Sequence, residues 1–79
     1  MSKNLGVHRK LVSAKEISKL ADISYATINN YTDMGLLDIV AKQNRVRLYD
    51  LKHTKERLAV IARLINEGYT LRVIVKLLK

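Results

Sequence analysis

Two adjacent asparagines, Asn29 and Asn30, lie in the middle of a segment that has the start and stop signals of a short helix. A side-chain amide donates and accepts at once, which matches the N6 and N7 groups of adenine in the major groove of DNA. With Ala26 and Asp33, the asparagines follow the i, i+3, i+4, i+7 spacing of one helix face. Asparagine is a poor residue inside a helix, so this pair indicates a binding surface. The alternative is a poorly optimised surface helix without a partner.

The signals around this face predict a helix over residues 24–34. Ser24 can accept hydrogen bonds from the first free backbone N–H groups, and Gly35 can adopt the left-handed conformation that ends a helix. Ile28 and Tyr31 mark the buried side, although Tyr31 could equally belong to the exposed surface.

A preceding helix is predicted over about residues 14–20 because Ser13 and Glu16 have the spacing of a capping box. Its expected buried side consists of Ile17, Leu20 and Ala21. The short connection at 22–24 makes the two helices a helix-turn-helix, whose second helix conventionally enters the major groove.

After Gly35 the apolar period changes from helical to alternating, which predicts a two-stranded hairpin within residues 38–49. Its tip would be Lys42 to Arg45, with Asn44 taking the positive φ of a tight turn. A basic hairpin next to a helix-turn-helix is typical of a wing that meets phosphates or a minor groove. The alternative is a solvated hairpin whose cations only discourage pairing at the strand edge.

Two further helices complete the predicted fold. Leu58, Ile61 and Leu64 fall on one stripe of a helix expected over about residues 54–67, and Thr70 begins a last helix that is rich in aliphatic residues. The sequence therefore predicts a mainly α-helical winged helix-turn-helix of about four helices, with a short two-stranded wing between the second and third. We expect residues 1–11 to form a flexible basic arm and residues 12–79 to form the domain.

Charge and composition restrict the function. Fifteen Lys and Arg residues against seven Asp and Glu residues give 79 residues a net charge of +8, typical of a protein that binds a polyanion. There is no cysteine, and we expect no cofactor and no metal site. No paired carboxylates, nucleophile-base set or glycine-rich phosphate loop indicates an enzyme. No apolar run is long enough for a signal peptide or a membrane span, so we expect a cytoplasmic, nucleoid-associated protein without a membrane partner.

Three blocks, SYATINNYTDMGLL, VRLYD and LAVIARLINEGYTLRVIVKLL, resemble in order and spacing the N-terminal winged-helix domain of the MerR family of bacterial transcription regulators. The resemblance covers about residues 12–78. The residues at family positions are Thr27, Tyr31, Gly35, Leu36, Leu37, Arg47, Tyr49, Gly68 and Leu71.

The sequence departs from the family pattern at several contact positions. Asn29 replaces the usual arginine of the recognition helix, Asn30 replaces an aromatic residue, and Arg45-Val46 replaces the usual Gly-Tyr of the wing. The resemblance implies either a homodimer, formed through a C-terminal helix that this chain lacks, or a monomer binding side by side on DNA.

The leading hypothesis is sequence-specific binding of double-stranded DNA by a module of a bacterial or phage-type transcription regulator. Alternatives are an excisionase-like, partition or chromosome-organising DNA-binding factor, and a protein-interaction adaptor. Tyr25 is expected at phosphate or sugar, and the basic cluster at residues 8–10 can add phosphate contacts. The residues predicted at base edges are Ala26, Thr27, Asn29 and Asn30, and those predicted at the backbone are Lys15, Lys42, Arg45 and Arg47.

Overall fold

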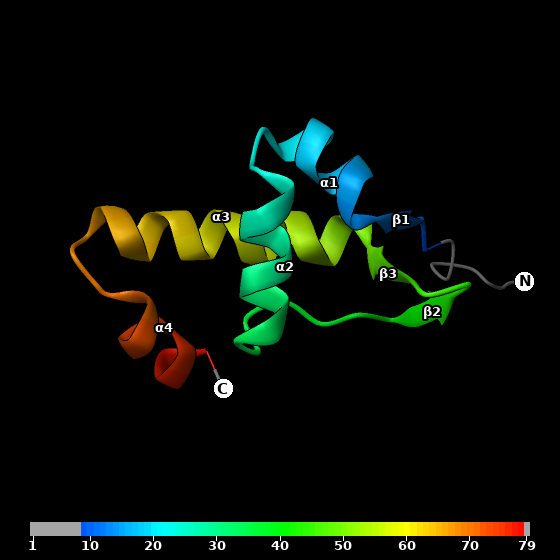
Figure 1. The fold of residues 1–79 in the computed structure, drawn as a ribbon. Helices are drawn as coiled ribbons and strands as arrows, with labels where there is room; N and C mark the ends of the chain where they lie inside the picture. Colours follow the sequence, from blue (N-terminus) through cyan, green and yellow to red (C-terminus); the bar gives the residue numbers. More distant parts are fainter. Residues whose placement is uncertain (1–8, 79) are drawn as a thin grey trace, which may run out of the picture.

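The computed structural model describes residues 9–78, which form four helices and three short strands (Figure 1). This confirms a mainly helical winged helix-turn-helix with a hairpin between the second and third helices. The elements in chain order are β1 (Leu11–Ser13), α1 (Ala14–Ala21), α2 (Tyr25–Asp33), β2 (Ala41–Gln43), β3 (Val46–Asp50), α3 (Leu51–Asn66) and α4 (Leu71–Leu77).

Side-chain caps define the start of the two helices of the helix-turn-helix. The predicted capping box is present at α1, where Ser13 Oγ accepts from the Glu16 N–H at 3.2 Å and Glu16 Oε1 accepts from the Ser13 N–H at 3.1 Å. Ser24 Oγ accepts from the Thr27 N–H at 3.0 Å and begins α2. Between the helices, Asp22 takes the left-handed conformation. Gly35 does the same after α2, with φ +85°, as predicted.

The sheet contains one strand more than predicted. The order is β1-β3-β2, all antiparallel, so β3 is the central strand. Leu11 pairs with Asp50 and Val12 with Tyr49. Residues 1–8 of the predicted arm lie outside the described residues, whereas Leu11, its last residue, belongs to the sheet.

The core lies where α1, α2, α3 and the sheet meet, and α4 closes it from the other side of α3. Tyr49, Ile17, Ile28, Ile61 and Ile74 are fully buried. Leu20 was predicted on the buried side of α1, but 56% of it is exposed. The other two predicted residues are confirmed, since Ile17 is fully buried and Ala21 is half-buried against the core, and Ala14 is buried as well. Ala14, Ile17 and Ala21 follow the i, i+3, i+7 spacing of one stripe, and Leu20 lies to one side of it.

Helix α3 begins earlier than predicted. It starts at Leu51 rather than near Thr54, because Asp50 Oδ1 accepts from the His53 N–H at 2.9 Å and caps the helix directly at the end of β3. The wing strand and the longest helix therefore join without a loop. Thr70 caps α4 as predicted, through Thr70 Oγ1 and the Val73 N–H at 3.3 Å.

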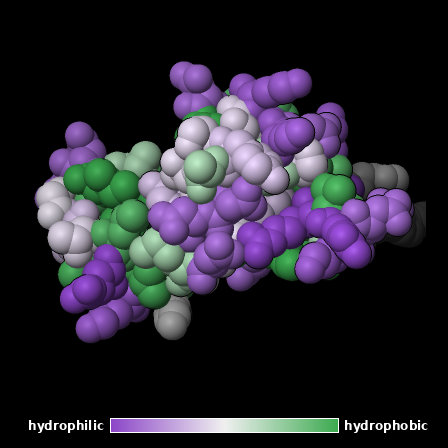
Figure 2. Space-filling model, in the orientation of Figure 1, coloured by the Kyte–Doolittle hydropathy of each residue, from purple (hydrophilic) through white to green (hydrophobic). Residues whose placement is uncertain are grey.

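Polar and apolar side chains are unevenly distributed over the surface, although the wing and α1 also expose apolar side chains such as Val40, Val46 and Leu20. Figure 2 shows hydrophilic side chains over α2 and the wing, and hydrophobic ones gathered toward the end formed by α4 and the close of α3. The exposed large apolar side chains of that end are Ile65, Tyr69, Val73 and Leu77.

Candidate nucleic-acid interface

A groove of about 520 Å³ lies between the start of α1, the outer side of α2 and the wing. It brings together six of the nine residues that the sequence analysis predicted to contact DNA. They come from α1, α2 and the wing, which only the folded chain places around one concave surface. These six residues are Lys15, Tyr25, Asn29, Lys42, Arg45 and Arg47.

The other three predicted residues lie on α2 and are not among those that line the groove. Ala26 and Asn30 are exposed, and Asn30 carries no hydrogen bond from its side chain among the described residues. Thr27 is half-buried, and its hydroxyl lies 2.7 Å from Ser24 Oγ. Thr27 therefore supports the cap of the helix, while Asn29 and Asn30 are the side chains with unused amide groups.

The wing tip is a two-residue turn formed by Asn44 and Arg45. Both have positive φ, 51° and 68°, as a type I′ hairpin turn requires. The prediction for Asn44 is confirmed. Arg45 was not expected to share this conformation, which glycine adopts freely and which costs about 1–2 kcal/mol in other residues. The wing thus keeps a cation at its tip despite a cost in backbone energy.

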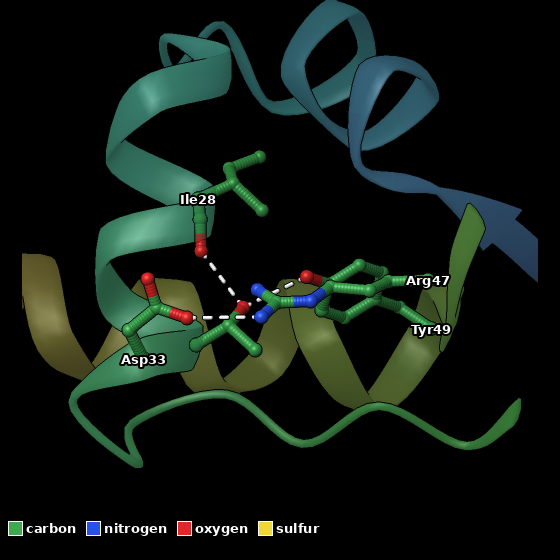
Figure 3. Close-up of polar contacts among 5 residues, drawn as sticks. Ile28, Asp33, Arg47 and Tyr49 are labelled. Atoms are coloured by element: carbon green, nitrogen blue, oxygen red, sulfur yellow. Dashed lines mark hydrogen bonds and ion pairs between the residues drawn. The ribbon is translucent and has the colours of Figure 1, made fainter. Parts of the chain in front are cut away.

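Arg47 does not extend freely from the wing. It shares a sheet face with Tyr49, and its Nη2 donates to Asp33 Oδ1 of α2 at 3.0 Å (Figure 3). The Asp33 carboxylate, followed by the Tyr49 hydroxyl, raises the pKa of Arg47 above its ordinary value. This ion pair connects the end of the recognition helix to the wing.

A chain of hydrogen bonds lies next to this ion pair. The Thr32 hydroxyl donates to the Ile28 carbonyl at 2.8 Å, and it also lies 2.8 Å from the Tyr49 hydroxyl. Because a hydroxyl has one hydrogen, Tyr49 must donate to Thr32. Buried Tyr49 is therefore a core support, and Tyr31 is half-buried against the core.

The family model of the MerR helix-turn-helix regulatory proteins matches residues 12–79. The chain belongs to the MerR family. It is thus a DNA-binding domain of the kind found in transcription regulators, and its partner class is double-stranded DNA. No significant match was found among curated proteins or among solved structures.

This MerR-family domain carries a second group of cations that the sequence analysis recognised only in part. Arg9 and Lys10 lie with Lys52 and Lys55 around a depression of about 490 Å³ at the start of α3. Arg9 Nε donates to Asp50 Oδ2 at 2.8 Å. Lys52 and Lys55 were missed because a Lys at helical spacing normally indicates only a solvated face.

In the part of the chain that the structure describes, no helix has the length and apolar character needed to cross a membrane.

Proposed function

We propose that this MerR-family domain is the sequence-reading module of a bacterial transcription regulator. In this proposal α2 enters the major groove of double-stranded DNA, and the wing rests on the flanking backbone or in the adjacent minor groove. Its place of action would be the cytoplasm, on the nucleoid. The observation that carries the proposal is the groove that joins the outer side of α2 to the cationic wing and the start of α1.

The chemistry of α2 and of the groove beside it supports a division of roles. Asn29 and Asn30 offer amides that match the adenine edge, and Ala26 and Thr27 offer small groups suited to close approach. Tyr25, about half exposed at the start of α2, is suited to a phosphate or sugar contact. The cations that surround this reading surface on two sides are Lys15, Lys42 and Arg45.

The conformation of Arg45 is a second argument for a cationic contact at the wing tip. A glycine at this position would remove the strain of φ 68° and would also remove the charge. We therefore expect Arg45→Gly to raise the free energy of unfolding by about 1 kcal/mol and yet to weaken DNA binding. The salt dependence of log K should become shallower by about 0.9, the value for one phosphate contact. Stabilisation without loss of affinity would exclude Arg45 from the interface.

Selection of preferred sites from random duplex DNA at near-physiological salt tests the proposed function. The wild-type domain should enrich a motif, and an Asn29→Ala, Asn30→Ala double variant should lose the preference at the bases that these amides read, at about 1–3 kcal/mol per base. Asn66→Ala is the matched control, because Asn66 is an exposed asparagine at the end of α3 that does not line the groove.

The outcomes of this selection distinguish a sequence-reading module from a factor that coats or organises DNA. A motif that loses base preference only in the double variant supports the sequence-reading module. Two copies of a half-site at a fixed spacing would indicate a homodimer. Binding without enrichment would instead indicate a factor that coats or organises DNA. If the wild-type domain and the double variant select the same motif, Asn29 and Asn30 do not read bases.

A further inference from the structure

Asp33 is an acidic residue on the side of α2 that is proposed to face DNA. It follows Asn29 by four residues and Asn30 by three, so it lies on the same helix face one turn further along. Its side chain is 63% exposed. An unpaired carboxylate at this position would repel the phosphate backbone, so its presence on this face needs an explanation.

Arg47 supplies the missing counter-charge from the wing. Its guanidinium donates to Asp33 Oδ1, so the two side chains form a neutral unit and Asp33 Oδ2 has no hydrogen bond among the described residues. Tyr49 lies beside the Arg47 side chain and is fixed by complete burial and by its hydrogen bond to Thr32. The carboxylate is thus neutralised and held in one direction, while one of its oxygens still accepts.

A carboxylate presented in this way matches one base in the major groove. Cytosine offers only a donor there, its N4 amino group, whereas adenine places the acceptor N7 next to its N6 amino group. We propose that Asp33 reads the N4 amino group of a cytosine through Oδ2, and that Arg47 acts as its positioning and neutralising residue rather than as a phosphate contact. This inference rests on the proposed insertion of α2 into the major groove.

Helix geometry gives the place of that cytosine in the site. Four residues of α-helix advance about 6 Å, so Asp33 lies about two base-pair steps from Asn29 along the groove. The direction is toward the C-terminal end of α2, because Asp33 is the last residue of that helix. The expected site therefore has a cytosine about two steps beyond the adenine read by the amides.

Site selection with Asp33→Ala tests the reading role. The variant should keep the base preferences that the Asn29→Ala, Asn30→Ala double variant loses, and it should lose the preference for cytosine about two steps away, on the side of the C-terminal end of α2. Asp38→Ala is the matched control, since Asp38 is an exposed aspartate outside α2. An Asp33→Ala motif identical to the wild-type motif would overturn the inference, although the proposed function would stand.

The salt dependence of binding tests the role of Arg47. Arg47→Ala leaves the carboxylate unneutralised and should weaken binding to every sequence by about tenfold, the effect of removing about one favourable charge contact. On duplex DNA that lacks the preferred site, adding Asp33→Ala should restore most of that affinity, with the wild-type salt slope, because a neutral pair has been removed. A slope shallower by about 0.9 in this double variant would show that Arg47 neutralises a phosphate and would overturn the assignment.

Two controls keep these outcomes interpretable. Thermal unfolding monitored by circular dichroism verifies that each variant is folded, which is expected because the Asp33 side chain is largely exposed and Arg47 is partly exposed. An Arg63→Ala, Glu67→Gln variant removes another neutral pair, the one on α3, and gives the baseline for the salt slope. A wild-type domain that selects no motif would instead contradict the proposed function itself.

Discussion

Helices α2 and α4 are built by the same local rules but present different outer faces. Each begins with a hydroxyl cap, Ser24 or Thr70, and each buries one isoleucine completely, Ile28 or Ile74. The outer face of α2 carries amides and a carboxylate, whereas the outer face of α4 carries the aliphatic Val73 and Leu77 beside Arg72 and Lys76. The caps and the buried isoleucines explain why the helices form, so only the outer faces distinguish a surface that can read DNA from one that cannot.

The largest effect on stability is expected from the fully buried isoleucine that each of these two helices contributes to the core. Ile28→Ala and Ile74→Ala should each lower the free energy of unfolding by about 2–5 kcal/mol, since both remove a fully buried aliphatic side chain. Urea unfolding measures the change, and the milder Ile→Val variants, at about 0.5–1.5 kcal/mol, cover the case in which the alanine variants do not fold.

Val73→Ala, on the exposed side of α4, is the control for this comparison and should change stability by less than about 0.5 kcal/mol. If Ile74→Ala lowers the free energy of unfolding far less than Ile28→Ala does, the two isoleucines are not equivalent. It would mean that α4 is anchored less firmly than α2, despite the equal burial of the two isoleucines.

A smaller effect is expected from the caps. Ser24→Ala and Thr70→Ala should each cost about 1 kcal/mol of stability, whereas glycine at the same positions should cost only a few tenths. The loss at Ser24 should be the larger, because its hydroxyl also bonds the Thr27 hydroxyl at 2.7 Å. Urea unfolding of the four variants would measure both differences, and a larger loss at Thr70 would reverse the predicted order.

The cap of α3 differs from the hydroxyl caps of α2 and α4 because it is a carboxylate, Asp50, which can be titrated. The backbone N–H of His53, followed by Arg9, lowers the pKa of Asp50 below its ordinary value. The stability that Asp50 contributes is therefore complete above the ordinary carboxyl pKa of about 4, and it is lost as pH falls through the lower pKa of the folded state.

Urea unfolding between about pH 6 and pH 2 measures this loss. Asp50→Asn should reduce the acid-induced loss of stability, whereas Asp38→Asn, at an exposed aspartate, is the matched control. If the Asp50→Asn variant and the wild-type domain lose the same stability on acidification, Asp50 does not contribute to the pH dependence. The hydroxyl caps of α2 and α4 should not contribute to this pH dependence.

Features that depend on neighbouring residues could be predicted from the sequence. The capping box of Ser13 and Glu16, the cap at Ser24 and the left-handed Gly35 each depend on contacts within a few residues, so their signals are local. The turn conformation of Asn44 belongs to the same class. These signals fixed the order of the helices and the position of the wing.

Features that depend on distant partners could not be predicted in this way. Strand β1 exists because Leu11 to Ser13 pair with β3, far along the chain. The Asp33–Arg47 ion pair joins residues from different elements. The sequence placed Arg47 correctly on the wing, but only the fold shows that it forms an ion pair with Asp33.

The strand order has a consequence for how the domain behaves in concentrated solution. Because β3 lies between β1 and β2, every residue of this longest strand is paired on at least one side, and Leu48 is paired on both. Both outer strands contain three residues, and Lys42 lies at the centre of β2. Short edges and a central lysine disfavour strand pairing between molecules. The wing can therefore project from the domain without becoming a template for aggregation.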